Sequence, residues 1–222
     1  GNPVGEYKSY YRDGKIKETG EYDADGMLTG VWKEYYKDGK TESEKSYSKG
    51  KLNGAIKYYS ANGIINEHFE YKNDVLVSYK AFDEEGKAFF EEEKYSKNDY
   101  QLEIYHSNGN LRRKGRVLKG ENEGVWEDYD VNGMLTKRVN YNNGTLDGEY
   151  TKFYAASGKV KSVMIYDDGK TDGIYKEYYP SGKLYREGAY VDDDLVGSWI
   201  VYYPDGKVKS SYYYKDGILD GW

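Results

Sequence analysis

The side chains that most often perform catalysis or bind metals are few in this chain. Cysteine is absent and only two histidines are present, His68 and His106, so a thiolate site, a cysteine nucleophile and a histidine-rich metal site are excluded. The acidic runs Asp192-Asp193-Asp194 and Asp167-Asp168-Gly169 lie in turn sequences and lack the alternating ligands of a calcium loop. We therefore expect no metal, no cofactor and no enzymatic activity.

Aromatic rings and lysines are the groups that recur, and their chemistry is binding. The chain has 29 tyrosines and 4 tryptophans among 222 residues. Exposed rings of this kind are enriched at protein interfaces, and a row of lysines attracts anionic lipid headgroups. The net charge of -6 opposes nucleic-acid binding. No apolar run approaches the roughly 20 residues of a transmembrane helix. The absence of cysteine leaves both a cytoplasmic location and export after removal of a signal peptide open.

The recurrence has a period of about 24 residues and covers nearly the whole chain. Nine repeats and the beginning of a tenth start at Gly5, Gly30, Gly54, Val77, Tyr100, Gly124, Gly148, Gly173, Gly197 and Gly221. We interpret residues 1–222 as a single repeat array. Whether Gly221-Trp222 caps the last hairpin, precedes more chain or meets a second chain end to end stays open.

Four positions within the repeats hold recurring types of residue. The apolar position, two residues after the start, holds Tyr7, Trp32, Ile56, Tyr79, Leu102, Trp126, Tyr150, Tyr175 and Trp199. The ring position, five after the start, holds Tyr10, Tyr35, Tyr59, Phe82, Tyr105, Tyr129, Phe153, Tyr178 and Tyr202. The second tyrosine position follows it and holds Tyr11, Tyr36, Tyr154, Tyr179 and Tyr203, with Ser60, Asp83, His106 and Asp130 in the other repeats. The turn lysines follow the glycine of a turn and are Lys15, Lys40, Lys87, Lys159, Lys183 and Lys207.

Turn residues between these positions predict β-hairpins. Asp13-Gly14 and Asn132-Gly133 are examples of dipeptides that supply the positive φ of tight hairpin turns. The segments between turns have strand length and are rich in Tyr, Trp, Val and Ile. We predict an all-β fold, an elongated and twisted array of about nine β-hairpin repeats in an open single-layer sheet. The apolar and ring positions differ in parity, so either both faces carry aromatic rings or a bulge lies between them.

The pattern Gly-x-Trp/Tyr-x-x-Tyr-Tyr-x-x-Gly-Lys, seen in Gly30–Lys40 and Gly173–Lys183, resembles the MORN-repeat variant found in many bacterial proteins. The resemblance implies hairpins laid side by side and a binding or scaffold role. Some relatives carry an antitoxin label, and other MORN proteins are associated with phospholipids and protein scaffolding. The repeats over 77–123 depart from the pattern, and this region is either sequence drift or a specialised contact zone.

The sequence favours a non-enzymatic scaffold that binds a macromolecular partner, most of all a protein, in an antitoxin-like or adaptor role. The second tyrosine position tolerates Ser and Asp, which indicates solvent access there. The candidate partner contacts are Tyr11, Tyr36, Tyr154, Tyr179, Tyr203, Trp32, Trp126 and Trp199. The first alternative is a phospholipid surface bound through the turn lysines. The second is a cell-surface carbohydrate, because glucan- or choline-binding repeats are also rich in Gly, Trp and Tyr.

Overall fold

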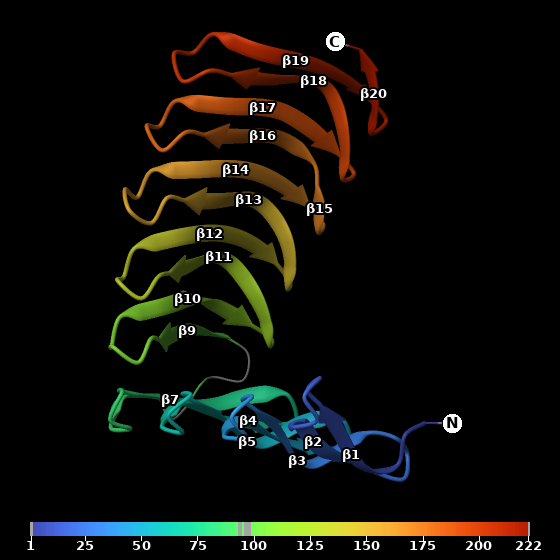
Figure 1. The fold of residues 1–222 in the computed structure, drawn as a ribbon, viewed down its shortest axis with the longest axis vertical. Coiled ribbons are helices and arrows are strands. Elements are labelled where there is room, and N and C mark those ends of the chain that lie inside the picture. Colours follow the sequence, from blue (N-terminus) through green and yellow to red (C-terminus); the bar gives the residue numbers. More distant parts are fainter. Residues whose placement is uncertain (1, 93–94, 96–98, 222) are drawn as a thin grey trace. The chain divides into compact units, whose positions relative to one another are not determined.

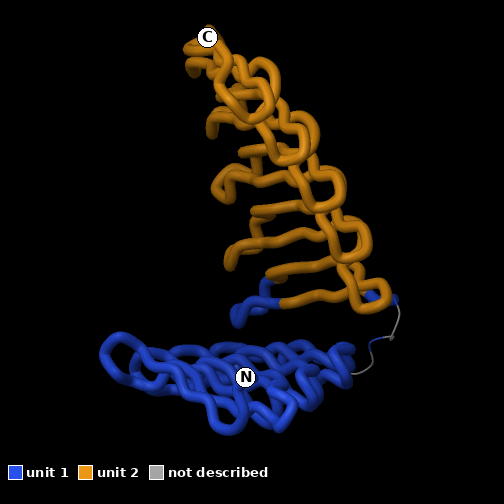
Figure 2. The backbone as a smooth tube through the Cα atoms, turned by 90° about the vertical axis from the view of Figure 1, so that its right-hand side faces the viewer, with its two compact units in different colours: residues 1–100, 105–110 blue, residues 101–104, 111–222 orange. Residues whose placement is uncertain are grey.

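The protein is described by a computed structural model that covers residues 2–92, 95 and 99–221 (Figure 1). Its strands form two sheets, one of eight strands and one of twelve. The chain divides into two compact units, residues 1–100 with 105–110 and residues 101–104 with 111–222 (Figure 2).

The strands are short and follow each other closely. The first sheet contains β1 (Gly5–Tyr10), β2 (Ile16–Tyr22), β3 (Leu28–Tyr35), β4 (Thr41–Ser48), β5 (Lys51–Tyr59), β6 (Ile65–Lys72), β7 (Val75–Phe82) and β8 (Ala88–Glu92). The second contains β9 (Asp99–Tyr105), β10 (Leu111–Leu118), β11 (Glu121–Tyr129), β12 (Leu135–Asn142), β13 (Thr145–Phe153), β14 (Val160–Asp167), β15 (Lys170–Thr171), β16 (Gly173–Tyr178), β17 (Leu184–Val191), β18 (Asp194–Tyr202), β19 (Val208–Lys215) and β20 (Ile218–Gly221).

Strand order in both sheets is the order of the chain, neighbouring strands pair in antiparallel fashion, and the two-residue β15 pairs with β14. Within the described residues there is no helix. The prediction of an all-β array of antiparallel hairpins is therefore confirmed, with the strands distributed over two open sheets. Figure 1 shows the hairpins of the second sheet, β9 to β20, side by side in chain order.

Two kinds of turn alternate along the chain. In the longer turn the Tyr11 N–H donates to the Lys15 carbonyl and Gly14 takes a φ of 83°, as the Asp-Gly dipeptide predicts. In the shorter turn two consecutive residues have positive φ, for example 51° at Lys49 and 76° at Gly50, which is the signature of a type I′ hairpin. Asp192 and Asp193 adopt it at 50° and 73° without a glycine, as short polar side chains tolerate.

The short turns also bond from one repeat to the previous one. The Gly50 N–H donates to the Leu28 carbonyl at 2.9 Å, and the Gly217 N–H donates to the Leu195 carbonyl at 3.1 Å. These bonds extend the sheet ladder past the strand ends. A turn is consequently fixed by its neighbouring repeat as well as by its own sequence.

The structure shows both a bulge between the apolar and ring positions and aromatic rings on both faces of the sheet. A register shift lies just before the ring position, as at Glu34/Tyr35 and Val201/Tyr202. The ring hydroxyls nevertheless bond to side chains on the face opposite the apolar position, since Tyr59 donates to Glu44 at 3.1 Å and Glu44 pairs with Lys33 at 2.8 Å. We call the side that carries the apolar-position residues the core face, and the other side the opposite face.

The core of each sheet is a row of large side chains on the core face. The buried apolar residues are Trp32, Ile56, Phe69, Leu76, Tyr79 and Ala81 in the first sheet and Val117, Trp126, Val139, Tyr175 and Trp199 in the second. Aromatic side chains remove roughly 150–250 Å² each from water, so a single sheet can gain burial from rings that lie along its own surface.

Candidate binding surfaces

The three tryptophans at the apolar position are packed into the sheets. Trp32, Trp126 and Trp199 are only 7, 3 and 7% exposed. Each indole N–H donates across to a backbone carbonyl of the preceding strand, at Glu21, Arg116 and Ala189, over 3.1–3.2 Å. The structure thus places most of the surface of these three candidate contacts in the core and leaves only a small part of each side chain accessible.

Each of these tryptophans lies over a glycine of the preceding strand, a pairing that the sequence analysis missed. A Cβ built on Gly20, Gly115 or Gly188 would stand 2.1–2.2 Å from an indole carbon. The glycines precede their tryptophans by eleven or twelve residues, so the spacing itself was visible in the sequence. A ring that covers a strand glycine shields the exposed backbone there.

Tyrosines surround the tryptophans and complete two similar clusters. Trp32 stacks on Tyr7 with ring centroids 5.2 Å apart and meets the edge of Tyr22 at 5.1 Å. Trp199 stacks on Tyr175 at 5.6 Å and meets Tyr190 at 5.1 Å. Stacked and edge-to-face pairs of this kind add about 0.5–1.5 kcal/mol each beyond area burial.

The second tyrosine position is used for bonding between repeats. Tyr11, Tyr36, Tyr154 and Tyr179 donate their hydroxyls to the carbonyls of Tyr35, Tyr59, Tyr178 and Tyr202 over 2.5–2.8 Å. Each bond reaches the ring-position residue of the next repeat. Tyr203 is 47% exposed, and its hydroxyl makes no hydrogen bond within the described part of the chain.

The turn lysines form a second set of bonds between repeats. Lys15, Lys40, Lys159 and Lys183 donate their ammonium groups to the carbonyls of Lys37, Ala61, Ser181 and Pro204 over 2.7–2.8 Å. Lys87 is exposed, and the Lys207 side chain is 83% exposed. Four of the six turn lysines therefore hold neighbouring repeats together through backbone oxygens.

Charged side chains line the core face beside the aromatic rows, and their sign differs between the sheets. Glu18 pairs with Glu34 across the first sheet, and the same row continues through Ser43 and Tyr58 to Glu67. Arg113, Lys137, Lys152 and Arg186 occupy the same row in the second sheet, beside Asp128 and Glu177. Burial raises the pKa of Glu34, but hydrogen bonds from Ser43 and Lys45 outweigh it and leave the pKa below its ordinary value.

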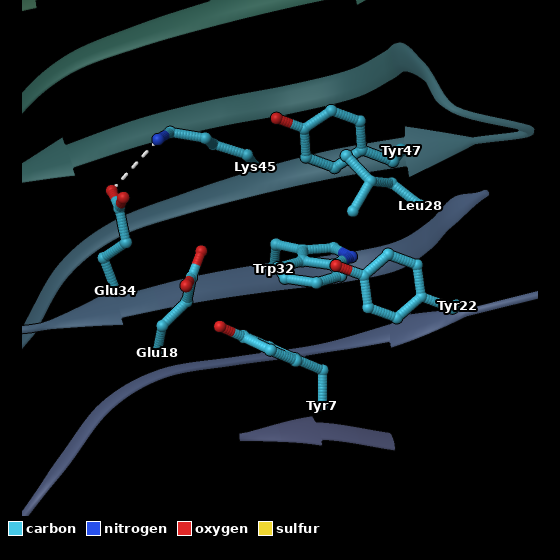
Figure 3. Close-up of a pocket in the computed structure, with 8 residues that line it drawn as sticks. All are labelled: Tyr7, Glu18, Tyr22, Leu28, Trp32, Glu34, Lys45 and Tyr47. Atoms are coloured by element: carbon cyan, nitrogen blue, oxygen red, sulfur yellow. Dashed lines mark hydrogen bonds and ion pairs between the residues drawn. The ribbon is translucent and has the colours of Figure 1, made fainter. Parts of the chain in front are cut away.

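A cavity of about 240 Å³ lies on the core face of the first sheet (Figure 3). It is lined by Tyr7, Glu18, Tyr22, Leu28, Trp32, Glu34, Lys45 and Tyr47. The Lys45 ammonium lies 3.0 Å from the Glu34 carboxylate, whereas the Glu18 carboxylate has no ion pair or hydrogen bond among the described residues. The walls are aromatic and the uncompensated charge is negative.

The opposite face carries exposed apolar side chains that folding leaves uncovered. Ile165, Ile174, Ala189 and Tyr213 lie on strands β14, β16, β17 and β19, and we call them the exposed patch. Ile165 and Ala189 are partly exposed, and Ser198 of β18 pairs with Tyr213. Ile174 is 58% exposed and Tyr213 is 48% exposed. Val31 and Val125 stand at the same position of other repeats and are half exposed.

Metal-binding clusters and membrane-spanning helices are both absent from the part of the chain that the structure describes. Among the described residues, no three His, Asp or Glu side chains gather as ligands for a metal ion. The described part of the chain contains no helix that is long and apolar enough to cross a membrane.

Known solved structures give only a weak likeness. The "Crystal Structure of TcdB2-TccC3-Cdc42" matches at 11% identity and a TM-score of 0.19, over 94% of this chain and 14% of that one. The "Crystal Structure of TcdB2-TccC3-TEV" matches at 10% identity and a TM-score of 0.20, over 95% and 16%. The chain thus spans about a seventh of these structures, and no curated protein matches its sequence.

The family comparison is decisive by contrast. The MORN repeat variant pattern matches six segments, residues 3–24, 28–49, 52–73, 122–143, 171–192 and 195–216, which together make up more than half of the chain. Each segment contains one hairpin and its linking turn. The resemblance inferred from the aromatic and glycine positions is confirmed, and the chain belongs to the MORN repeat variant family.

Proposed function

We propose that this MORN repeat protein is a non-enzymatic scaffold that binds a protein partner. The observation that carries the proposal is the exposed patch on the opposite face of the second sheet. Ile174 and Tyr213 keep about half of their surface in water although the fold buries rings elsewhere. Exposed apolar side chains with a charged rim are typical of protein interfaces. Ile174 pairs with Ala189 in register, and the charged pair Lys176 and Glu187 lies next to them on the same two strands.

The exposed patch replaces the tyrosines and tryptophans as the preferred contact. The hydroxyls of Tyr36 and Tyr179 already donate hydrogen bonds to backbone carbonyls, and the tryptophan side chains are buried in the core of their sheets. The same reasoning weakens the two alternatives. A lipid surface would have to compete with the carbonyls that hold Lys40 and Lys183, and a sugar would need an open indole face.

A capture experiment with a matched variant tests the proposal. The full chain is immobilised, lysate of the source cells is passed over it, and retained proteins are identified by mass spectrometry. We expect one protein in stoichiometric amount, retained by the wild type and lost by the double variant Ile174→Ser and Tyr213→Ser. The control is Val208→Ser with Ile218→Ser, which removes apolar groups of 57 and 73% exposure that are not members of the patch.

The possible outcomes of the capture experiment distinguish protein binding from lipid and carbohydrate binding. Retention lost only in the patch variant supports the proposal, and a toxic enzyme as the retained protein assigns the antitoxin-like role. Equal retention by the patch variant and the control overturns the patch as the contact. Retention of no protein, together with salt-sensitive binding to anionic vesicles or with glycan binding, overturns the protein-binding proposal itself.

A further inference from the structure

The second sheet fills its aromatic clusters with its own arginines. The Arg113 Cζ lies 4.6 Å from the ring centroid of Trp126, and its Nε lies 3.4 Å from the Asp128 carboxylate. The Arg186 Cζ lies 5.2 Å from the ring centroid of Tyr175, and its Nε donates to Glu177 at 2.6 Å. In both places a guanidinium rests against an aromatic ring and beside a carboxylate.

The first sheet has the same cluster with a carboxylate in place of the arginine. Arg113 and Arg186 each stand two residues before the glycine that lies under a tryptophan, at Gly115 and Gly188. The residue two before Gly20 is Glu18. Register agrees, because Glu18 pairs with Ser9 just as Arg186 pairs with Glu177.

The rings around the two positions correspond closely. Tyr7, Tyr22, Trp32 and Tyr47 line the cavity of the first sheet, where the second sheet has Tyr175, Tyr190, Trp199 and Tyr214. The first sheet therefore keeps the aromatic walls of a guanidinium site and lacks the guanidinium. The cavity of about 240 Å³ is several times the roughly 30 Å³ that one water takes up in the liquid.

The charges at the cavity call for one more cation. Lys45 balances Glu34, and no counter-charge among the residues that the structure describes is in contact with Glu18. A second hollow of about 160 Å³ adjoins it and shares Glu18 and Glu34, and it adds Glu42 and Lys17. Taken over both hollows, three carboxylates face two ammonium groups.

We propose that the cavity at Trp32 binds the guanidinium of an arginine side chain presented by a partner peptide. The identification of the partner as a protein rests on the proposed function, and the site deepens it by naming what the partner presents. Arginine fits better than lysine because its planar, weakly hydrated head stacks on rings and bonds a carboxylate at its edge. Glu18 supplies that carboxylate, as Glu177 does for Arg186.

The test uses the full chain and three capped tripeptides, Gly-Arg-Gly, Gly-Lys-Gly and Gly-citrulline-Gly. Citrulline has the shape of arginine without its charge. Binding is followed by the indole N–H resonances in two-dimensional NMR, in which each tryptophan gives one signal. We expect the arginine peptide to shift the Trp32 signal and the citrulline peptide to bind at least about tenfold more weakly.

Substitutions within the chain should remove arginine binding from the first sheet and create it in the second. Glu18→Gln keeps the shape of the side chain and should weaken arginine binding at least about tenfold, and Glu18→Arg should abolish it by filling the cavity as Arg186 fills its own. Arg186→Glu places a carboxylate at the matching position of the second sheet, where Glu177 stands in place of Ser9. The Trp199 signal should then respond to the arginine peptide in addition to that of Trp32.

Several results would overturn the inference. Equal binding of the citrulline peptide, or unchanged binding by the Glu18→Gln variant, would show that no cation is recognised. Equal binding of the lysine peptide would overturn the choice of guanidinium. The exposed patch lies in the other sheet, so the variant Ile174→Ser with Tyr213→Ser should keep full arginine binding, and the two proposals fail independently.

Discussion

Replacing Gly188 by alanine should destabilise the protein by about 3 kcal/mol. The backbone of Gly188 is not in the left-handed region, so the effect is one of space alone. The new Cβ would stand 2.2 Å from Cδ2 and 2.3 Å from Cε2 of Trp199. Since carbon atoms in contact lie about 3.5–4 Å apart, the indole must withdraw by about 1 Å or more.

The magnitude follows from what that withdrawal breaks. Overpacking of a core costs about 1–3 kcal/mol. The moved ring also loses its hydrogen bond to the Ala189 carbonyl, about 1 kcal/mol, and part of its stack on Tyr175, about 0.5–1.5 kcal/mol. With a urea m value of about 3 kcal/mol/M, the unfolding midpoint should fall by about 1 M.

Urea unfolding followed by far-ultraviolet circular dichroism measures the effect, and Gly221→Ala provides the matched control. Gly221 also lies in a strand without positive φ, but a Cβ there would meet nothing within 4 Å. It should shift stability by less than about 0.5 kcal/mol. The double variant Gly188→Ala with Trp199→Leu should cost less than the sum of its parts, because the smaller side chain frees the space. If Gly188→Ala is as mild as Gly221→Ala, the account of tryptophan over glycine is refuted.

Three further predictions concern hydrogen bonds and protonation. Tyr36→Phe removes the 2.6 Å hydrogen bond to the Tyr59 carbonyl and should lower the free energy of unfolding in urea by about 1 kcal/mol. Tyr203→Phe removes no such bond and should leave the stability unchanged. Equal effects of the two substitutions would contradict the bonding role of Tyr36. Burial raises the pKa of Glu127, but hydrogen bonds from Tyr129, Arg138 and Lys114 outweigh it and hold the pKa at about 2. Because the folded pKa lies below the unfolded one, this stabilisation is present above pH 4.5 and should be lost as the pH falls towards 2, by at most about 3 kcal/mol. In the Glu127→Gln variant the free energy of unfolding should vary less with pH over this range. An unchanged pH dependence would contradict the assignment to Glu127. Burial raises the pKa of Tyr71 to about 12, so its contribution to stability is complete below pH 10 and is lost between about pH 10 and 12. The ultraviolet titration of Tyr71→Phe should lack one tyrosine that ionises near pH 12, and loss of a tyrosine that ionises near pH 10 would refute this prediction.

The hairpins were predictable because turn chemistry is local. Asp13-Gly14 and Asn132-Gly133 require positive φ, and the structure gives Gly14 83° and Gly133 81°. The division into two sheets was not predictable from these dipeptides. Strand pairing depends on contacts between hairpins, and the second sheet begins with β9 in the region 77–123, where the sequence had only shown a departure from the pattern.

The role of the second tyrosine position was hidden for a different reason. Ser60 and Asp130 occur at the same position, which indicated solvent access, and the side chains there are indeed partly exposed. The hydroxyl of Tyr36 nevertheless reaches a carbonyl 23 residues later. A backbone acceptor leaves no trace in the sequence, because every residue has one.

The tryptophan clusters left a signal in the sequence that was not recognised. Gly20, Gly115 and Gly188 each precede a tryptophan by a nearly constant spacing, and residue 18, 113 or 186 stands two places earlier. That the first of these is a glutamate and the others are arginines was readable in the sequence. What the sequence lacked was the register that brings the three residues onto one face.

The lysine bonds between repeats have a consequence for how such a chain can change. Their acceptors are the backbone oxygens of Lys37, Ala61, Ser181 and Pro204, four residues with unrelated side chains. A repeat therefore recognises its neighbour by the path of the main chain and not by the identity of the residues along it. A whole repeat can accordingly be duplicated, deleted or exchanged between related genes without a matching substitution next to it. Residues such as Glu18 are then free to diverge one repeat at a time, and each array can acquire its own sites on a common frame.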